Sequence, residues 1–127
     1  MTDEALKFIS EELTDAGINY EFGEWTTDPV PDPYFVGEYL ESPSTNEDGL
    51  QEASFILTGT GRNSWLALEL SKAIIKQLFN QISGKTAILS NGNGVAVFYS
   101  DSSIIPTGDA ELKRIQINLS IKEWSVN

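Results

Sequence analysis

One glycine-rich segment has the residue types of a possible phosphate-binding loop. It is Gly59-Thr60-Gly61-Arg62-Asn63-Ser64. It follows an apolar run at 55–57 and precedes a long helical pattern, which is the setting in which backbone N–H groups cradle a phosphate. However, it lacks the Lys-Ser/Thr pair of a nucleotide-binding loop and the later acidic residue of a dinucleotide site. The simpler interpretation is a turn followed by a helix N-cap, with Arg62 as its only fixed cation.

Four acidic residues in loop-like segments could supply paired carboxylates or calcium ligands: Asp28, Asp32, Glu47 and Asp48. The calcium-loop pattern, with its central glycine and terminal glutamate, does not fit around 46–49. Glycosidase carboxylates need a defined separation in space, which a sequence does not supply. Acids in Pro- and Ser-rich segments are more often solvated surface, and this is the preferred interpretation.

The sequence contains no cysteine and no histidine. Their absence excludes disulfides, thiol nucleophiles and zinc sites with sulfur or imidazole ligands, and it removes the commonest general base. A serine mechanism would then need lysine as its base, and no nucleophile elbow is present. We therefore expect no enzymatic activity, no cofactor and no metal.

The chain is strongly acidic, with 19 Asp and Glu against 8 Lys and Arg and a net charge of -11. Proteins that grip nucleic acid use Lys and Arg to displace phosphate counterions, so we expect no sequence-specific nucleic-acid binding. Binding to an anionic membrane is disfavoured for the same reason. The first residues, MTDEALKF, lack the basic region and apolar core of a signal peptide, which indicates a cytoplasmic protein.

Hydrophobic periodicity predicts two helices and about six strands around these residues. A first helix should begin at Thr2 or Asp3 and end at Gly17, and a second should follow the glycine-rich segment as far as Ile82. The predicted order is helix, three strands, helix, three strands. This grouping favours an α+β fold with a mostly antiparallel sheet of about five to six strands. The length of 127 residues is that of a single domain, residues 1–127.

The second helix carries two apolar rows. One row is Leu66, Leu70, Ala73, Ile74 and Leu78, and the other is Leu68, Ile75, Phe79 and Ile82. One row is enough to cover a sheet, so the other must be covered by the first helix or by another copy of the protein. We assign the second row to an interface. The candidate interface residues are Leu68, Ile75, Phe79, Glu47, Asp48 and Arg62.

Several segments in this order have counterparts in one phage protein family. They are the helix end Asp15-Ala16-Gly17-Ile18, the strand start Asp32-Pro33-Tyr34-Phe35-Val36, the helix start Asn63-Ser64-Trp65 and the long alternating strand at 113–124. In these segments the chain resembles the tail terminator (tail completion) and neck proteins of long-tailed bacteriophages and prophages. The resemblance covers essentially the whole chain.

The resemblance implies a non-enzymatic structural protein of the virion that caps the tail tube and joins the tail to the head. The implied partners are other copies of the chain, in a homo-oligomeric ring for which six subunits is one expected number, and the tail-tube and head-neck proteins. The implied location is the tail or neck of the virion, after assembly in the bacterial cytoplasm. The acidic balance fits this role, since a ring through which DNA passes should not bind it.

Two other functions stay open at this point. One is a small acidic, monomeric binding or regulatory domain that inhibits a partner by imitating nucleic acid. The other, less supported by the residues, is a small hydrolase. A ring-forming protein should self-associate as its concentration rises, whereas an acidic mimic should stay monomeric.

Overall fold

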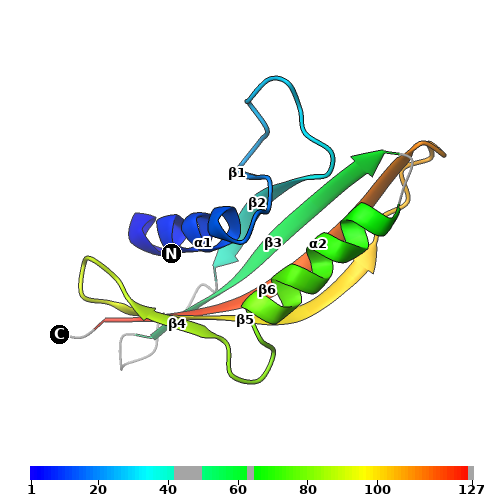
Figure 1. The fold of residues 1–127 in the computed structure, drawn as a ribbon. Coiled ribbons are helices and arrows are strands. Elements are labelled where there is room, and N and C mark those ends of the chain that lie inside the picture. The colour runs from blue at the N-terminus through cyan, green and yellow to red at the C-terminus, as the bar shows by residue number, and fades with distance from the viewer. Residues whose placement is uncertain (42–49, 63–64, 126–127) are drawn as a thin grey trace.

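The computed structural model describes residues 1–41, 50–62 and 65–125. Two helices and six strands follow one another in the predicted order, which confirms the α+β assignment (Figure 1). The elements are α1 (Asp3–Asp15), β1 (Tyr20–Phe22), β2 (Tyr34–Glu41), β3 (Leu50–Arg62), α2 (Trp65–Leu78), β4 (Lys85–Ile88), β5 (Gly94–Ile104) and β6 (Leu112–Trp124).

The six strands form one sheet in the order β1-β2-β3-β6-β5-β4. All neighbours are antiparallel except the short β1, which runs parallel to β2. The centre of the sheet is the pair β3 and β6, which stay in register from Leu50 opposite Trp124 to Arg62 opposite Leu112. Figure 1 shows these two strands crossing the molecule as long twisted ribbons, with α2 lying along β6 and α1 beside the end of β2.

The core lies on one face of this sheet, as the alternation in β6 predicts. Ile115, Ile117, Leu119 and Ile121 are buried and pack in one cluster with residues of both helices. The intervening residues of β6 point to the opposite face, which no described helix covers. Burial of each aliphatic side chain contributes about 1.5–3 kcal/mol before the loss of chain entropy is subtracted.

The first helix begins and ends where the sequence predicts. The Thr2 hydroxyl accepts a 3.2 Å hydrogen bond from the Ala5 N–H, which satisfies one of the free donors of the first turn. Gly17 follows the last turn with φ +85°, a conformation that glycine adopts without steric cost. Ala5, Ile9 and Leu13 form the buried face of α1.

The glycine-rich segment is not the turn that we expected. Gly59 and Gly61 lie within β3, which continues to Arg62; Gly59 pairs with both β2 and β6, and Gly61 pairs with β6. The reason for glycine is space, since a Cβ on Gly59 would lie 2.4 Å from Cε2 of Phe35, whose ring covers it. The interpretation of Gly59-Thr60-Gly61 as a chain reversal is therefore wrong, and these glycines let an aromatic ring pack directly on the strand.

Candidate assembly surfaces

The two apolar rows of α2 have exchanged the roles that we expected from the sequence. Leu68, Ile75 and Phe79 are fully buried beneath the helix, so their assignment to an interface is wrong. The physical reason is the way the end of α2 is fixed. The Phe79 carbonyl accepts a 2.7 Å hydrogen bond from the Tyr99 N–H of β5, and Leu68, Ile75 and Phe79 all pack in the core cluster with residues of the sheet.

The other row faces away from the sheet. Leu66, Leu70 and Ile74 recur every four residues and are 67%, 58% and 42% exposed. They follow one line along the outer side of α2, opposite the buried row. Large aliphatic side chains gathered on one exposed helix face are typical of interaction surfaces.

The outer side of α2 continues across a basic flank to the edge of β5. Lys72 pairs with Glu69 at 2.9 Å, whereas Lys76 lies 5.4 Å from the centroid of the Tyr99 ring and makes no ion pair with a described residue. Between this flank and β5 is a hollow of about 280 Å³. Its lining residues are Glu69, Lys72, Ser102, Ser103, Ile104 and Ile115.

The second half of β5 is an open edge of the sheet. The pairing of β4 with β5 covers only residues 94–97, so within the described chain residues 100–104 have a strand neighbour, β6, on one side only. Ile104, at the end of this edge, is 63% exposed.

The opposite edge of the sheet is formed by β1 and the loop that follows it, at 23–33. Phe22 is 47% exposed and stacks on Tyr39 with ring centroids 5.9 Å apart, and Val30 is 55% exposed. Glu24 and Asp28 are also exposed in this segment. It combines apolar and acidic side chains.

Two carboxylates hold the loop at 23–33 in place. Glu21 accepts hydrogen bonds from the Thr26 hydroxyl at 2.6 Å and from the Thr26 and Thr27 N–H groups, and the Thr26 hydroxyl bond in particular lowers the pKa of Glu21. Asp32 accepts a 3.0 Å bond from the backbone N–H of Arg62. Arg62 thus lies at the end of β3, against this loop and not on α2. The other two predicted interface residues, Glu47 and Asp48, lie outside the described residues.

Charge is divided unevenly between the two parts of the chain, before and after residue 52, and the sequence already contains this signal. Residues 1–52 hold 14 of the 19 acidic residues but only Lys7 among the basic ones, so the remaining 75 residues hold 5 acidic and 7 basic residues. The first segment builds α1, β1, the 23–33 loop and β2, whereas the second builds α2, β5 and β6. The overall count of charges conceals this asymmetry, which a count by halves would have revealed.

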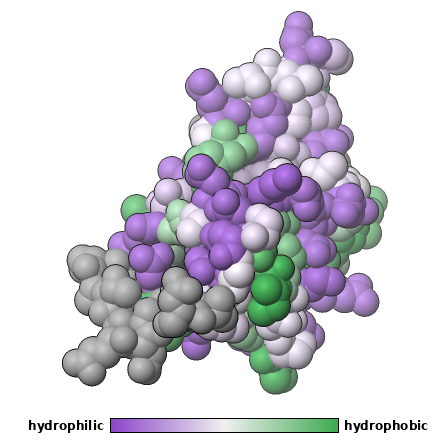
Figure 2. Space-filling view, turned by 90° about the vertical axis from the view of Figure 1, so that its left-hand side faces the viewer, coloured by the Kyte–Doolittle hydropathy of each residue, from purple (hydrophilic) through white to green (hydrophobic). Residues whose placement is uncertain are grey.

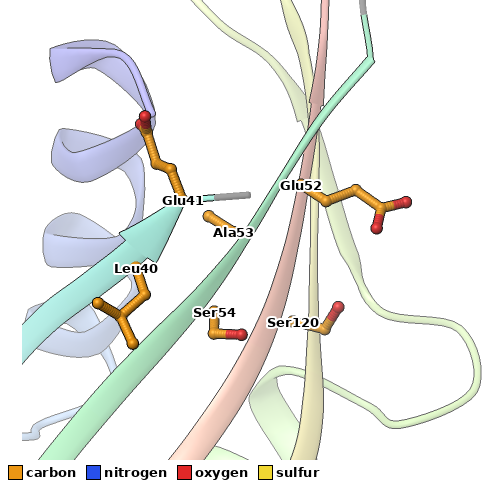
Figure 3. Close-up of a pocket in the computed structure, with 6 residues that line it drawn as sticks. All are labelled: Leu40, Glu41, Glu52, Ala53, Ser54 and Ser120. Atoms are coloured by element: carbon orange, nitrogen blue, oxygen red, sulfur yellow. The ribbon is translucent and has the colours of Figure 1, made fainter. Parts of the chain in front are cut away.

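A hollow of about 300 Å³ opens on the uncovered face of the sheet. It is lined by Leu40, Glu41, Glu52, Ala53, Ser54 and Ser120. Figure 3 shows the carboxylates of Glu41 and Glu52 pointing away from the two serine hydroxyls, and Glu41 pairs with the amino terminus of Met1. Neither hydroxyl is therefore placed beside a base that could activate it.

Within residues 1–41, 50–62 and 65–125, no group of three or more Asp or Glu residues could hold a metal ion. No helix in these ranges is long and apolar enough to cross a membrane. The side of the molecule nearest α1 is mostly hydrophilic, with hydrophobic residues in small groups (Figure 2). The surface on this side is therefore less apolar than the outer row of α2, which is Leu66, Leu70 and Ile74.

The fold is similar to that of a chain in a solved structure described as the virion of a native gene transfer agent (GTA) particle. The TM-score is 0.64 with 8% sequence identity, and the match covers 90% of this chain and 84% of that chain. At this identity the match shows a shared fold. No model of a known protein family matches the sequence, and no curated protein matches it.

Proposed function

We propose that this protein is a non-enzymatic structural subunit of a bacteriophage or prophage particle. More specifically, we propose that it caps the tail tube and joins the tail to the head as an oligomeric ring in the tail or neck of the virion. The observation that carries this proposal is the similarity in fold, over 90% of the chain, to a chain of a gene transfer agent virion.

Three further observations support a role in assembly. The outer row of α2 presents large aliphatic side chains to solvent, as a surface covered by a neighbour would. The acidic residues are concentrated in residues 1–52, which suits contacts between surfaces of unlike charge. The serines of the hollow beside β3 have no activating base, so the features of this site favour structure over catalysis.

The proposal is tested first by the mass of the protein in solution. Light scattering should be measured from low micromolar to several hundred micromolar concentration. A ring former should increase in mass with concentration and then level off at a fixed multiple of the 14.0 kDa chain. A mass of one chain throughout, with no binding to tail tubes, would rule out the proposal.

The concentration of acidic residues in 1–52 also favours a second candidate, a monomeric domain that imitates nucleic acid. Such a domain should stay at the mass of one chain and should displace DNA from a basic DNA-binding protein in a salt-dependent manner. A ring-forming structural protein should increase in mass with concentration and should not displace DNA. The same mass measurement, combined with a DNA-displacement assay, therefore separates the two functions.

A further inference from the structure

We propose that the free edge of β5 pairs with the same edge of a second copy, antiparallel and about a two-fold axis, so that one sheet runs through both copies. This inference goes beyond the proposed function, because a two-fold contact is complete with two chains and does not by itself build a ring. The parts that meet are residues 101–104 of β5 and the flank of α2 that carries Glu69 and Lys72.

The far half of β5 lacks the features that normally keep a sheet edge unpaired. Proteins protect such edges with charged side chains, with proline or with a covering segment. β1, at one end of the sheet, carries Glu21, and β4, at the other end, carries Lys85. Residues 102–104 of β5 are Ser-Ser-Ile, without charge or proline, and no described strand lies beyond them (Figure 1). This edge is therefore open to a further strand.

The backbone of this edge is oriented for pairing. The Ile105 N–H donates a 3.0 Å hydrogen bond to the Arg114 carbonyl of β6. Successive residues of a strand turn their polar groups to opposite sides, so Ser102 and Ile104 direct their N–H and C=O groups away from β6. With Ser103 on the two-fold axis, Ser102 of each copy lies opposite Ile104 of the other, and these outward groups pair with one another.

The side chains of this edge are complementary to themselves. Ser102 and Ile104 lie on the helix side of the sheet, since their partners in β6 are the buried Ile117 and Ile115. Ile104 is 63% exposed, and Ser102 lines the hollow of about 280 Å³ beside α2. The pairing places Ile104 of the second copy opposite Ser102, at the wall of this hollow. The large side chain of each copy thus lies against the small side chain of the other and loses contact with water.

Charge favours a second copy as the occupant of this edge. The chain has a net charge of -11, so two copies repel each other over most of their surface. Around this edge the signs are balanced, because Glu69 and Lys72 line the hollow, Lys76 lies over Tyr99, and Asp101 is on β5 itself. A two-fold contact brings carboxylates and ammonium groups together in equal number. A strongly acidic or strongly basic partner would instead set some of these groups against like charge.

A cross-link tests the contact directly, because the sequence has no cysteine. Ser103→Cys introduces a single thiol that lies opposite its own counterpart across the two-fold axis. Directly opposed residues of an antiparallel pair have Cα atoms about 4.5–5.5 Å apart, which is within the range of a disulfide. Mild oxidation at a concentration where the chain self-associates should therefore give a disulfide-linked species of twice the 14.0 kDa chain mass.

Ser54→Cys is the matched control for the cross-link. Ser54 is exposed as well, but it lies on β3 in the interior of the sheet. Its thiols meet only by collision, so this variant should cross-link at least about 10-fold more slowly than Ser103→Cys.

A charge exchange measures the same contact without cysteine. Lys72→Glu should raise the Kd of the dimer by about 10-fold or more, since it sets carboxylates of the two copies against each other. The double variant Lys72→Glu with Glu69→Lys restores both signs and should return the Kd close to that of the unmodified chain. Analytical ultracentrifugation gives each Kd, after circular dichroism and a thermal melt have shown that both variants are folded.

Three results would overturn the inference. Equal rates of cross-linking in the two cysteine variants would show that residue 103 does not face a second copy. A self-association that Lys72→Glu leaves unchanged would place the contact elsewhere. An unmodified chain that keeps the mass of one chain at several hundred micromolar would exclude the pair altogether. The proposed function is judged separately, by oligomers larger than two chains and by binding to tail tubes.

Discussion

The Thr2 hydroxyl donates a 2.7 Å hydrogen bond to the buried carboxylate of Glu123, which fixes the start of α1 to the end of β6. The same carboxylate accepts bonds from the Thr2 N–H at 3.1 Å and from the Asn93 side-chain amide at 3.0 Å. Thr2 is also the N-cap of α1, and Asn93 lies in the turn between β4 and β5. The Glu123 carboxylate of β6 therefore accepts bonds from two segments that are distant in sequence, and it joins three segments of the chain.

Glu123→Gln should destabilise the protein by about 1–3 kcal/mol, because an amide cannot accept all of these bonds and brings donors of its own into a buried site. Urea or guanidinium unfolding, monitored by circular dichroism at neutral pH, measures the difference. Glu111→Gln is the matched control, because Glu111 is exposed and should change stability by less than about 0.5 kcal/mol. Equal losses of stability in both variants would contradict the role of Glu123 as a stabilising hydrogen-bond acceptor.

The same carboxylate predicts a dependence of stability on pH. Burial alone would raise the pKa of Glu123, but hydrogen bonds from Asn93 and Thr2, together with the amino-terminal charge, outweigh it and lower the pKa from its ordinary value of 4.5. A carboxyl whose pKa is lowered on folding stabilises the protein above its ordinary pKa. This contribution is lost as the pH falls toward the lowered value.

We therefore expect the unmodified protein to lose more stability than Glu123→Gln when the pH is lowered from neutrality through the ordinary glutamate range. The comparison isolates Glu123, since the other carboxylates titrate in both proteins. Melting temperatures measured across this range provide the test. Parallel curves would show that Glu123 contributes nothing to the pH dependence.

Neighbouring isoleucines on α2 predict opposite effects. Ile75 is fully buried, so Ile75→Ala should cost about 2–5 kcal/mol of stability. Ile74 is 42% exposed, so Ile74→Ala should cost less than about 1 kcal/mol but should weaken self-association. Chemical unfolding at a concentration where the protein is monomeric, followed by light scattering at high concentration, separates the two effects. The reverse order would restore the interface predicted from the sequence.

The glycines of β3 give a further graded prediction. A Cβ on Gly59 would lie 2.4 Å from the Phe35 ring, whereas one on Gly61 would have its nearest contact at 3.2 Å, with Leu68. Gly59→Ala should therefore destabilise the protein by about 1–3 kcal/mol, and Gly61→Ala should cost less. The two melting temperatures check the order. If Gly61→Ala proved the more harmful, the space above Gly59 would not be the reason for glycine there.

The sequence predicts most of the fold because the hydrophobic periodicity of each helix and strand depends only on residues close together in the chain. The alternation from Ile115 to Ile121 and the capped helix from Thr2 to Gly17 each depend on neighbouring residues, and the structure confirms both. The role of Gly59 depends instead on Phe35, which is 24 residues away in sequence and opposite it in the sheet. No local pattern distinguishes such a packing glycine from a turn glycine.

The assembly surfaces were harder to predict, for two physical reasons. Both rows of α2 are apolar, so the pattern alone did not decide whether Ile74 or Ile75 faces the sheet. The orientation depends on tertiary contacts, among them the packing of Ile75 in the core cluster and the hydrogen bond between Phe79 and Tyr99. The exposure of Phe22 depends on β1 being an edge strand, which the order of the strands in the sheet decides. The separation of charge between the two halves of the chain was the one signal that the sequence itself contained.

The most direct test of a structural role at the tail is to image tail tubes with the protein bound. Tubes assembled from the tube protein of the same genome should be incubated with the purified chain and examined by negative-stain electron microscopy. The proposal predicts added ring-shaped density at one end of each tube, and tubes that no longer elongate when more tube protein is supplied. Bare tube ends and unchanged elongation, with protein in large excess, would contradict it.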